Sequence, residues 1–519
     1  MKRYSGILKI SLLIITALSV WSCNSYFELE RPVPEPWQSP SELEMVVREG
    51  YMQFTTSDPW QNPLGALPLI HFGQSDLAQL LHDQPGNNGS IIYYNRGFGG
   101  KEPTGFEVEW CFKHLFRTIT AENAGLKLLN DAEAKGVDPF IGMSDKDRNF
   151  VKRLKGEMYF LRGLAYFYLA RIYAPPFDPS GSNDKRCFVL RTEYVNNADE
   201  LKNGKLGSVA EVWKQIEDDF KEAKRLLPES YVAAPEVKGR VNKHAASAML
   251  CRTYFMTGQH NLAKTECDDI IKSGMYDLSE NPLVAFARVG DQDAREVIWE
   301  FRYQSGSERF ARHWGIMGKN VYNGVRTQGY SIYTLSYWAL RTVGWIANDL
   351  SETEEAKKDL RYQQVYMRYE ANQDPLFKTL LPYPMVWLDK YFNGGSHTQA
   401  QRYATVPMIR LAEIYLTRAI ILFNSGDASG AAADVNEVRR RAGLDPIAAG
   451  SLTANDIHNE RIKEMAGENG DRMYYLISLR LPLGIGDRKP DQFSPIQPPY
   501  SNYYWEVPLQ EREQNQAYQ

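Results

Sequence analysis

Apolar residues recur at helical spacing along several long segments of this chain. Between Phe150 and Ile172 an apolar residue falls every three or four positions, so a helix over this segment has one continuous apolar face. Pro175 and Pro176 end the pattern, because proline interrupts a helix. The protein is therefore predicted to be mainly α-helical. Further predicted helices span residues 41–54, 110–130, 208–227, 242–257, 261–273, 407–424, 428–442, 455–465 and 471–479.

Capping residues support several of these helix starts. Ser, Asn and Asp side chains accept hydrogen bonds from the free N–H groups of a first helical turn, and they are therefore common immediately before a helix. The predicted N-caps are Ser41, Ser208, Asn261 and Asp427.

Two predicted helix pairs share one residue pattern around a turn glycine. Gly258 in the first pair and Gly426 in the second are each followed five residues later by an alanine, Ala263 or Ala431. Small residues at this place let two helices approach closely, as in tetratricopeptide hairpins. The predicted fold is a scaffold of tetratricopeptide-like helical hairpins with a loop-rich, aromatic variable region packed on it. The other matching positions are Ala246, Phe255, Cys267 and Ile270 against Ile414, Phe423, Val435 and Val438.

The variable region is residues 280–405, which lie between the two repeats. Val297–Phe301 is a predicted strand, and after it Tyr and Trp are scattered among Gly, Ser and Asn. Residues 83–105 form a similar stretch. Long loops in a compact protein are usually functional or disordered, and their aromatic content argues against disorder.

Aromatic rings in polar loops point to carbohydrate binding, because their flat apolar faces stack on the C–H faces of sugars. Packing in the core is the alternative role for any one of these rings. The predicted ligand contacts are Tyr93, Tyr94 and Arg96 from the first stretch and Tyr303, Trp314, Tyr322 and Tyr330 from the second.

The first residues have the pattern of a secretory signal. Lys2 and Arg3 precede an apolar stretch, residues 7–20, that is short for a membrane span. Val20-Trp21-Ser22-Cys23 then resembles a bacterial lipobox, although Trp21 is bulkier than the residue usual there. We expect residues 1–22 to be a lipoprotein signal peptide and Cys23 to carry the lipid, with cleavage at a non-lipidated site as the alternative.

The residues after Cys23 indicate where in the cell envelope the protein is located. Asn24 stands where many lipoproteins retained at the inner membrane have Asp, which favours the outer membrane. Glu28 and Glu30 are compatible with export to the cell exterior. Residues 23–40 form the lipidated Cys and a Pro-rich tether, which we expect to be extended.

Charge and missing motifs exclude several functions. With 60 Lys+Arg and 64 Asp+Glu in 519 residues the net charge is -4, so no nucleic-acid partner is expected. Arg439-Arg440-Arg441 is accordingly interpreted as a solvated helix face. Nucleophile-elbow, zinc-protease and phosphate-loop motifs do not occur in the sequence, and the His residues lack ligand spacing. We expect no catalytic residues, no metal site and no cofactor.

Besides Cys23 the chain has four cysteines, none at CxxC spacing. Cys251 and Cys267 fall on two neighbouring predicted helices and either pair in an oxidising compartment or are small buried apolar residues.

Several motifs together resemble the SusD/RagB family of outer-membrane nutrient-binding lipoproteins. Residues 155–169 are similar to its E-x-x-F-L-R-A-x-x-Y-F-x-L segment, and residues 240–246 to its R-x-x-K-x-A-A segment. Residues 406–416, 435–439 and 441–444 match further motifs. Residues 504–508 with Glu511 and Asn515 complete the resemblance, which covers nearly the whole mature chain. Its charged motif positions are Arg461, Glu464, Glu468 and Arg472.

The resemblance implies a helical scaffold and a role as the ligand-capturing partner of a SusC-like TonB-dependent transporter. The corresponding regions are an N-terminal helical region at 41–279, the variable ligand-binding insert at 280–405 and a C-terminal helical region at 406–519. The matched charged residues are interpreted as buried ion pairs and not as catalytic groups. They are Glu157, Arg162, Arg410, Glu413, Arg461 and Glu464.

The leading hypothesis is a cell-surface lipoprotein that binds an oligo- or polysaccharide, is anchored to the outer membrane and is not an enzyme. Capture of oligopeptides in the same transport system is the alternative. A helical-repeat assembly factor, which binds proteins and no small ligand, and a glycosidase, whose carboxylate pair is set by spatial separation, are the remaining competitors.

Overall fold

The computed structural model describes residues 37–55, 62–80, 92–94, 106–232, 236–286, 294–302, 321–322, 325–326, 333–369, 384–388, 390 and 406–519. Within them the protein is mainly helical, as predicted, and each of the long predicted helices is present. These are α2 (Pro40–Gln53), α5 (Phe106–Ala134), α6 (Asp145–Tyr173), α8 (Val209–Leu226), α10 (Lys243–Met256), α11 (His260–Lys272), α15 (Leu411–Asn424), α16 (Ala428–Arg441), α17 (Ala454–Met465) and α18 (Asp471–Ser478).

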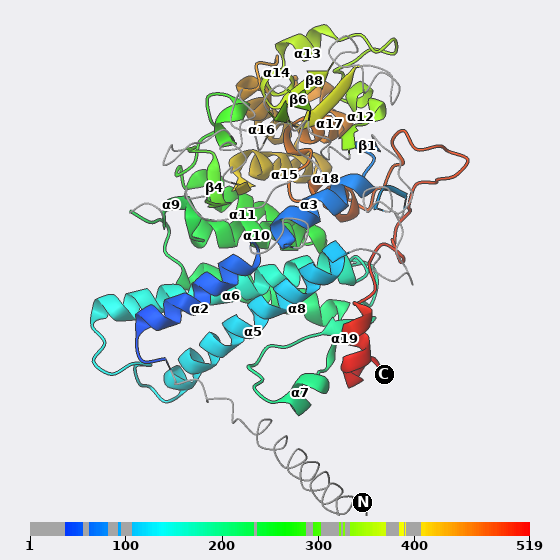
Figure 1. The fold of residues 1–519 in the computed structure, drawn as a ribbon. Helices are drawn as coiled ribbons and strands as arrows, with labels where there is room; N and C mark the ends of the chain where they lie inside the picture. The colour runs from blue at the N-terminus through cyan, green and yellow to red at the C-terminus, as the bar shows by residue number, and fades with distance from the viewer. Residues whose placement is uncertain are drawn as a thin grey trace, which may run out of the picture.

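The long helices stack in successive layers (Figure 1). Helices α2, α5, α6 and α8 lie side by side in the lower half, and the hairpins α10–α11 and α15–α16 follow above them. Short elements of the variable region lie at the top of the view. They include α12 (Tyr337–Thr342), α13 (Glu354–Lys358) and α14 (Leu360–Gln364), while α7 (Ala198–Lys202), α9 (Glu236–Gly239) and α19 (Leu509–Gln514) are short helices elsewhere.

The two predicted repeats form the expected hairpins, and each turns through a glycine with positive φ. Gly258 has φ +77° and Gly426 has φ +91°, a backbone region that favours glycine. The residue after each glycine donates back into the preceding helix, Gln259 N to Tyr254 O at 2.8 Å and Asp427 N to Leu422 O at 2.9 Å. This arrangement is the Schellman motif of helix ends.

Two of the four predicted N-caps are wrong. Ser208 and Asp427 cap α8 and α16 through their side chains. Helix α2 begins earlier than predicted, with Ser39 as its cap in place of Ser41. Helix α11 follows Gln259, which makes no side-chain cap bond, so Asn261 lies inside the helix.

Helix α3 (Pro63–Gln74) was not predicted, because its sequence is apolar on every side. All of its residues are buried, and Asn62 caps its start. A helix buried all round has no polar face, and Pro68 in its interior further argues against helix in the sequence.

Strand β4 (Val297–Phe301) is present as predicted and pairs antiparallel with β10 (Val406–Arg410). The predicted helix 407–424 is therefore wrong at its start, since its first residues are this strand and helix begins at Leu411. The other antiparallel pairs in the described parts are β1 (Ala78–Leu80) with β7 (Tyr333–Leu335), β2 (Arg186–Val189) with β3 (Leu206–Ser208), β5 (Val321–Tyr322) with β6 (Val325–Arg326) and β8 (Tyr366–Tyr369) with β9 (Met385–Leu388).

The charged motif residues form buried ion pairs, as predicted. Glu157 contacts Arg153 and Arg240, Arg162 contacts Asp219, and Glu413 contacts Arg252. Arg461 pairs with Asp471, which no sequence pattern indicated. All six predicted members are buried.

Arg410 and Glu464 belong to a larger buried network. Arg410 contacts Glu296, Glu464 and Glu468, and Arg441 contacts Glu296 and Glu464. Burial raises the pKa of the Glu464 carboxyl, but the cations around it outweigh burial and hold this pKa well below its usual value. The network joins β10, α16 and α17 to the base of the variable region.

The interpretation of Arg439-Arg440-Arg441 as a solvated face is wrong for one member. Arg440 is exposed, and Arg439 is half-buried against Glu460. Arg441 is 5% exposed and belongs to the buried network. Three consecutive residues on a helix point in three directions, so one of them faces the core.

No helix within the described ranges is long and apolar enough to cross a membrane.

Candidate ligand-binding site

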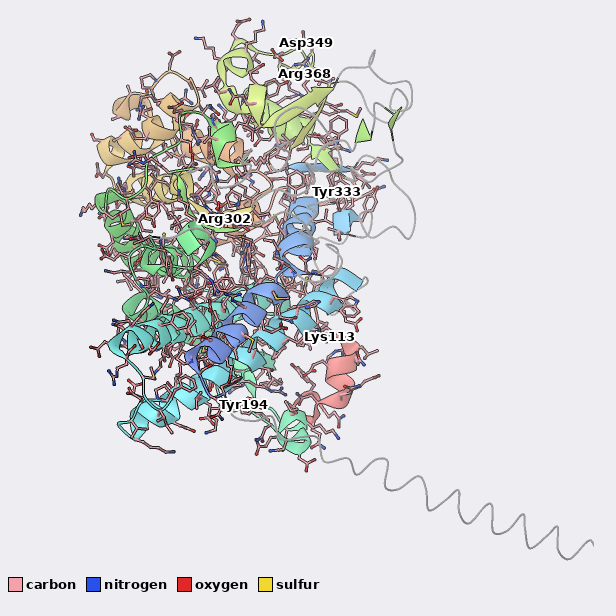
Figure 2. All side chains as sticks on the ribbon, turned by 60° about the vertical axis from the view of Figure 1, so that its left-hand side comes forward. Lys113, Tyr194, Arg302, Tyr333, Asp349 and Arg368 are labelled. Carbon is pink, nitrogen blue, oxygen red and sulfur yellow. The ribbon has the colours of Figure 1, made fainter. Side chains whose placement is uncertain are left out.

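Three segments that are distant in the sequence meet beside the predicted first loop. The first is the helical turn 92–94, the second runs from β7 into α12, and the third is the loop of residues 479–500. Tyr93 stacks on Tyr333 of β7 with ring centroids 6.4 Å apart. Figure 2 labels Tyr333 close to the blue helix α3, below Arg368 and Asp349 and far from Tyr194 at the bottom of the molecule.

Arg488 holds the third segment against the first. Its guanidinium donates to Tyr93 O at 3.1 Å, Ser75 O at 2.9 Å and Gly73 O at 2.7 Å. The same group lies over the Tyr93 ring, 3.9 Å from its centroid. Because one buried cation satisfies carbonyls from α3 and from the turn, the backbone around Tyr93 has a fixed position.

Asp487 positions the second segment. Its carboxylate accepts from the backbone N–H of Trp338 at 3.1 and 3.2 Å, in the first turn of α12, where a negative charge is favourable. Ser336 caps the same helix and also donates to Asp76 O at 2.7 Å.

Arg472 supports the segment from below. It donates to both oxygens of Asp76, at 2.9 and 2.7 Å, and lies 5.7 Å from the Trp338 ring. Burial opposes the charge on Arg472, but Asp76 outweighs it and raises the arginine pKa. The cation therefore stays charged beneath Trp338.

Partly exposed aromatic rings gather over this framework. Tyr94 is 42% exposed and stacks on Phe493, with centroids 5.9 Å apart and planes at 21°. Tyr337, Trp338 and Phe493 are half-buried, and the Arg341 guanidinium lies over the Tyr337 ring at 5.9 Å. Such a group of rings with a nearby cation can stack on sugar faces and donate to hydroxyl groups.

The predicted ligand contacts have different positions. Tyr93 is only 4% exposed, and its ring packs edge to face against the ring of Tyr94. Tyr322 lies in β5, but its side chain is outside the described part, and Arg96, Tyr303, Trp314 and Tyr330 lie wholly outside the described residues. Cys23 also lies outside them.

Sequence reasoning missed the contribution of residues 479–500. The aromatic Phe493 and the charged pair Asp487-Arg488 stand in a stretch rich in Pro and Gly, a composition that marks a loop as Gly, Ser and Asn did in the other two stretches. This signal was present, but the stretch lies inside the region assigned to the scaffold.

No group of three or more His, Cys, Asp or Glu side chains suited to a metal ion occurs among the described residues. His71, below the site, contacts the Tyr474 hydroxyl. Burial, together with nearby Arg171, lowers its pKa well below the usual value, so the imidazole is neutral at physiological pH.

Two family models match the chain in overlapping parts. The model described as "Starch-binding associating with outer membrane" matches residues 107–255, and the model described as "SusD family" matches residues 221–475. The chain belongs to the SusD/RagB family. No curated protein sequence matches it significantly.

Solved structures of SusD-like proteins share the fold over nearly their whole length. A SusD-like carbohydrate binding protein from Bacteroides vulgatus has 18% identity and a TM-score of 0.71, with 93% of this chain and 97% of that chain covered. A SusD superfamily protein from Bacteroides thetaiotaomicron has 18% identity and a TM-score of 0.71, covering 92% and 98%. A laminarin-binding SusD-like protein has 18% identity and a TM-score of 0.67, covering 92% and 98%.

Proposed function

We propose that this SusD/RagB-family protein is a non-enzymatic glycan-binding lipoprotein of the outer membrane, facing the cell exterior. The observation that carries the proposal is the group of partly exposed rings Tyr94, Phe493, Tyr337 and Trp338, held by Arg488 and Asp487 on a SusD-like fold. Arg96, Tyr303, Trp314, Tyr322 and Tyr330 are proposed as further contacts.

The energetics suit a binding protein for an extended polymer. Covering one face of a ring removes at most about 100 Å² from water, which stabilises a complex by about 2 kcal/mol. Part of this gain is lost to the ordering of ligand and loops, so two or three rings give weak to moderate affinity for each stretch of polymer.

Anchoring and transport are the other parts of the proposal. The family description associates its members with the outer membrane. We add that Cys23 carries the acyl chains, that the Pro-rich tether holds the globular part off the lipid, and that a SusC-like TonB-dependent transporter receives the glycan.

The names of related structures favour a carbohydrate ligand over a peptide ligand. Two of the SusD-like structures above are named for carbohydrate and for laminarin. No observation here favours an oligopeptide ligand, and a binding role accounts for the family motifs without catalysis.

Affinity electrophoresis of the mature, unlipidated protein through gels that each contain one polysaccharide tests the proposal. We expect retardation by one class of polymer, with laminarin included in the panel, and no shortening of that polymer on prolonged incubation. Retardation by none together with binding of mixed oligopeptides would overturn it, as would release of smaller sugars by the pure protein.

A further inference from the structure

A small cavity with mostly buried lining residues lies among α6, α10, α15, α17 and α18. Its volume is about 40 Å³. Apolar side chains such as Phe167, Phe255 and Met465 form part of its wall. Charged side chains form another part: Arg171, Arg252, Arg461, Glu413, Glu468 and Asp471.

Each carboxylate on the wall has a cation of its own. Glu413 accepts two bonds from Arg252, at 2.7 and 2.6 Å. Asp471 accepts from Nε and Nη2 of Arg461, at 2.9 and 2.5 Å. Glu468 is shared by Arg410 and Lys390, which belong to the neighbouring network. The negative charge around the cavity is therefore already balanced.

Arg171 is the remaining cation, and it has no carboxylate among the described residues. Its side chain donates to the carbonyl of Asn469 at 2.5 Å and stacks over the Tyr474 ring, 3.1 Å from the centroid. The residue is 7% exposed, and its Nε has no hydrogen-bond partner in the described parts. A buried charged donor without a partner is costly, because it has lost its hydration without replacement.

Arg252 adds a second donor to the same wall. Two of its nitrogens bind Glu413, and one of these also donates to Met408 O at 2.7 Å. Among the described residues Nη1 contacts only the Met249 sulfur, at 3.5 Å. Sulfur is a weak acceptor. Two guanidinium groups with spare N–H capacity thus border one space whose carboxylates are already paired.

We propose that this cavity binds one small monovalent anion, of which chloride is the probe. A water-sized occupant needs about 10–15 Å³, so the space admits a halide and excludes a bulky organic anion. The apolar part of the wall suits a weakly hydrated ion such as chloride or bromide. Bound there, the anion balances Arg171, and Arg171 in turn holds Asn469 between α17 and α18.

Thermal unfolding of the full mature protein in sodium chloride against sodium gluconate at equal ionic strength tests the site. Ligand binding to the folded state raises the midpoint, and from 1 to 100 mM chloride we expect a rise of about 1–2 °C in a chain of this size. Arg171→Met should remove the chloride-specific rise, while Arg225→Met, which changes an exposed arginine, should keep it.

Diffraction from wild-type crystals soaked in bromide gives a readout that does not depend on a variant. We expect an anomalous peak in the cavity, within hydrogen-bond distance of Arg171. A midpoint that depends only on ionic strength, or a soaked crystal with no anomalous peak in the cavity, would overturn the proposal.

Discussion

Tyr94 and Phe493 lie face to face, with their ring centroids 5.9 Å apart. One comes from the first loop region and the other from the loop that follows α18, so the pair exists only after the chain has folded. Tyr94 remains 42% exposed in this stack, which leaves it accessible to a ligand.

Replacing Tyr94 by Ala is expected to weaken polysaccharide binding about 10-fold, because loss of one stacked ring face removes about 1–2 kcal/mol. Isothermal titration calorimetry with the polymer found by affinity electrophoresis measures the change. Tyr194→Ala is the matched control, since Tyr194 is 37% exposed and lies at the other end of the molecule (Figure 2). Equal losses in both variants would show that the ring pair is not part of the site.

Arg441→Met is expected to destabilise the fold by about 3 kcal/mol, because Glu296 and Glu464 lose a buried cation that pairs with both. Urea unfolding at pH 7 measures the free energy of unfolding. Among the described residues its neighbour Arg440 pairs only with Glu437, at the surface, so Arg440→Met should change stability by less than about 0.5 kcal/mol. Similar values for the two variants would contradict the assignment of Arg441 to the buried network.

Glu122→Gln is expected to stabilise the protein at neutral pH and above. Glu122 is 0% exposed, and its carboxylate oxygens have no hydrogen-bond partner in the described parts. Burial, followed by repulsion from Glu157, raises the pKa of this carboxyl well above its usual value.

The sign of the pH dependence follows from that raised pKa. Below the pKa of the unfolded chain, about 4.5, both states are protonated and Glu122 contributes its full stability. As pH rises toward the raised folded pKa, this contribution is lost at about 1.4 kcal/mol for each pH unit. The advantage of Glu122→Gln over wild type should therefore grow between pH 5 and pH 8 in urea unfolding, whereas the exposed Glu354→Gln should show no such trend.

Cys251 and Cys267 are expected to form a disulfide under mild oxidation. Their sulfur atoms are 3.2 Å apart on the facing helices α10 and α11, and both residues are buried. Treatment with diamide should lower the intact mass by two hydrogens and place the bond between these two residues in peptide maps. Cys187 should stay a thiol, because among the described residues its sulfur contacts the Gly207 carbonyl and not another sulfur. Persistence of free thiols at both positions after diamide treatment of the folded protein would contradict this.

Helix periodicity and the turn glycines predicted the scaffold well, because an amphipathic helix and a positive-φ turn leave local marks in the sequence. Helix α3 has no such mark in its sequence, since it is buried on all sides and lacks a polar face. The strand β10 looked like the start of a helix because its partner β4 lies far away in the chain. The burial of Arg441 likewise depends on Glu296, which no local pattern connects to it.

The candidate site was only partly predictable for the same reason. The composition of the loops indicated Tyr94, but it could not separate Tyr94 from Tyr93, which packs beneath Arg488. Phe493 and Asp487 belong to the site only because Arg488, in the same loop, donates hydrogen bonds to the carbonyls of residues 73 and 75.

The antiparallel pairing of β4 with β10 has a consequence for how this protein can diversify. Phe301 and Val406 are register partners, so the chain leaves the scaffold and returns to it at adjacent points. The strand pair brings the two ends of this long segment together, which has an entropic cost. That cost rises only slowly with the number of residues in the segment, so a change in segment length alters it little. Insertions within 302–405 can accordingly change the length and specificity of this segment without moving the helices, provided that they leave β7, which pairs with β1, and Lys390, which pairs with Glu468, in place.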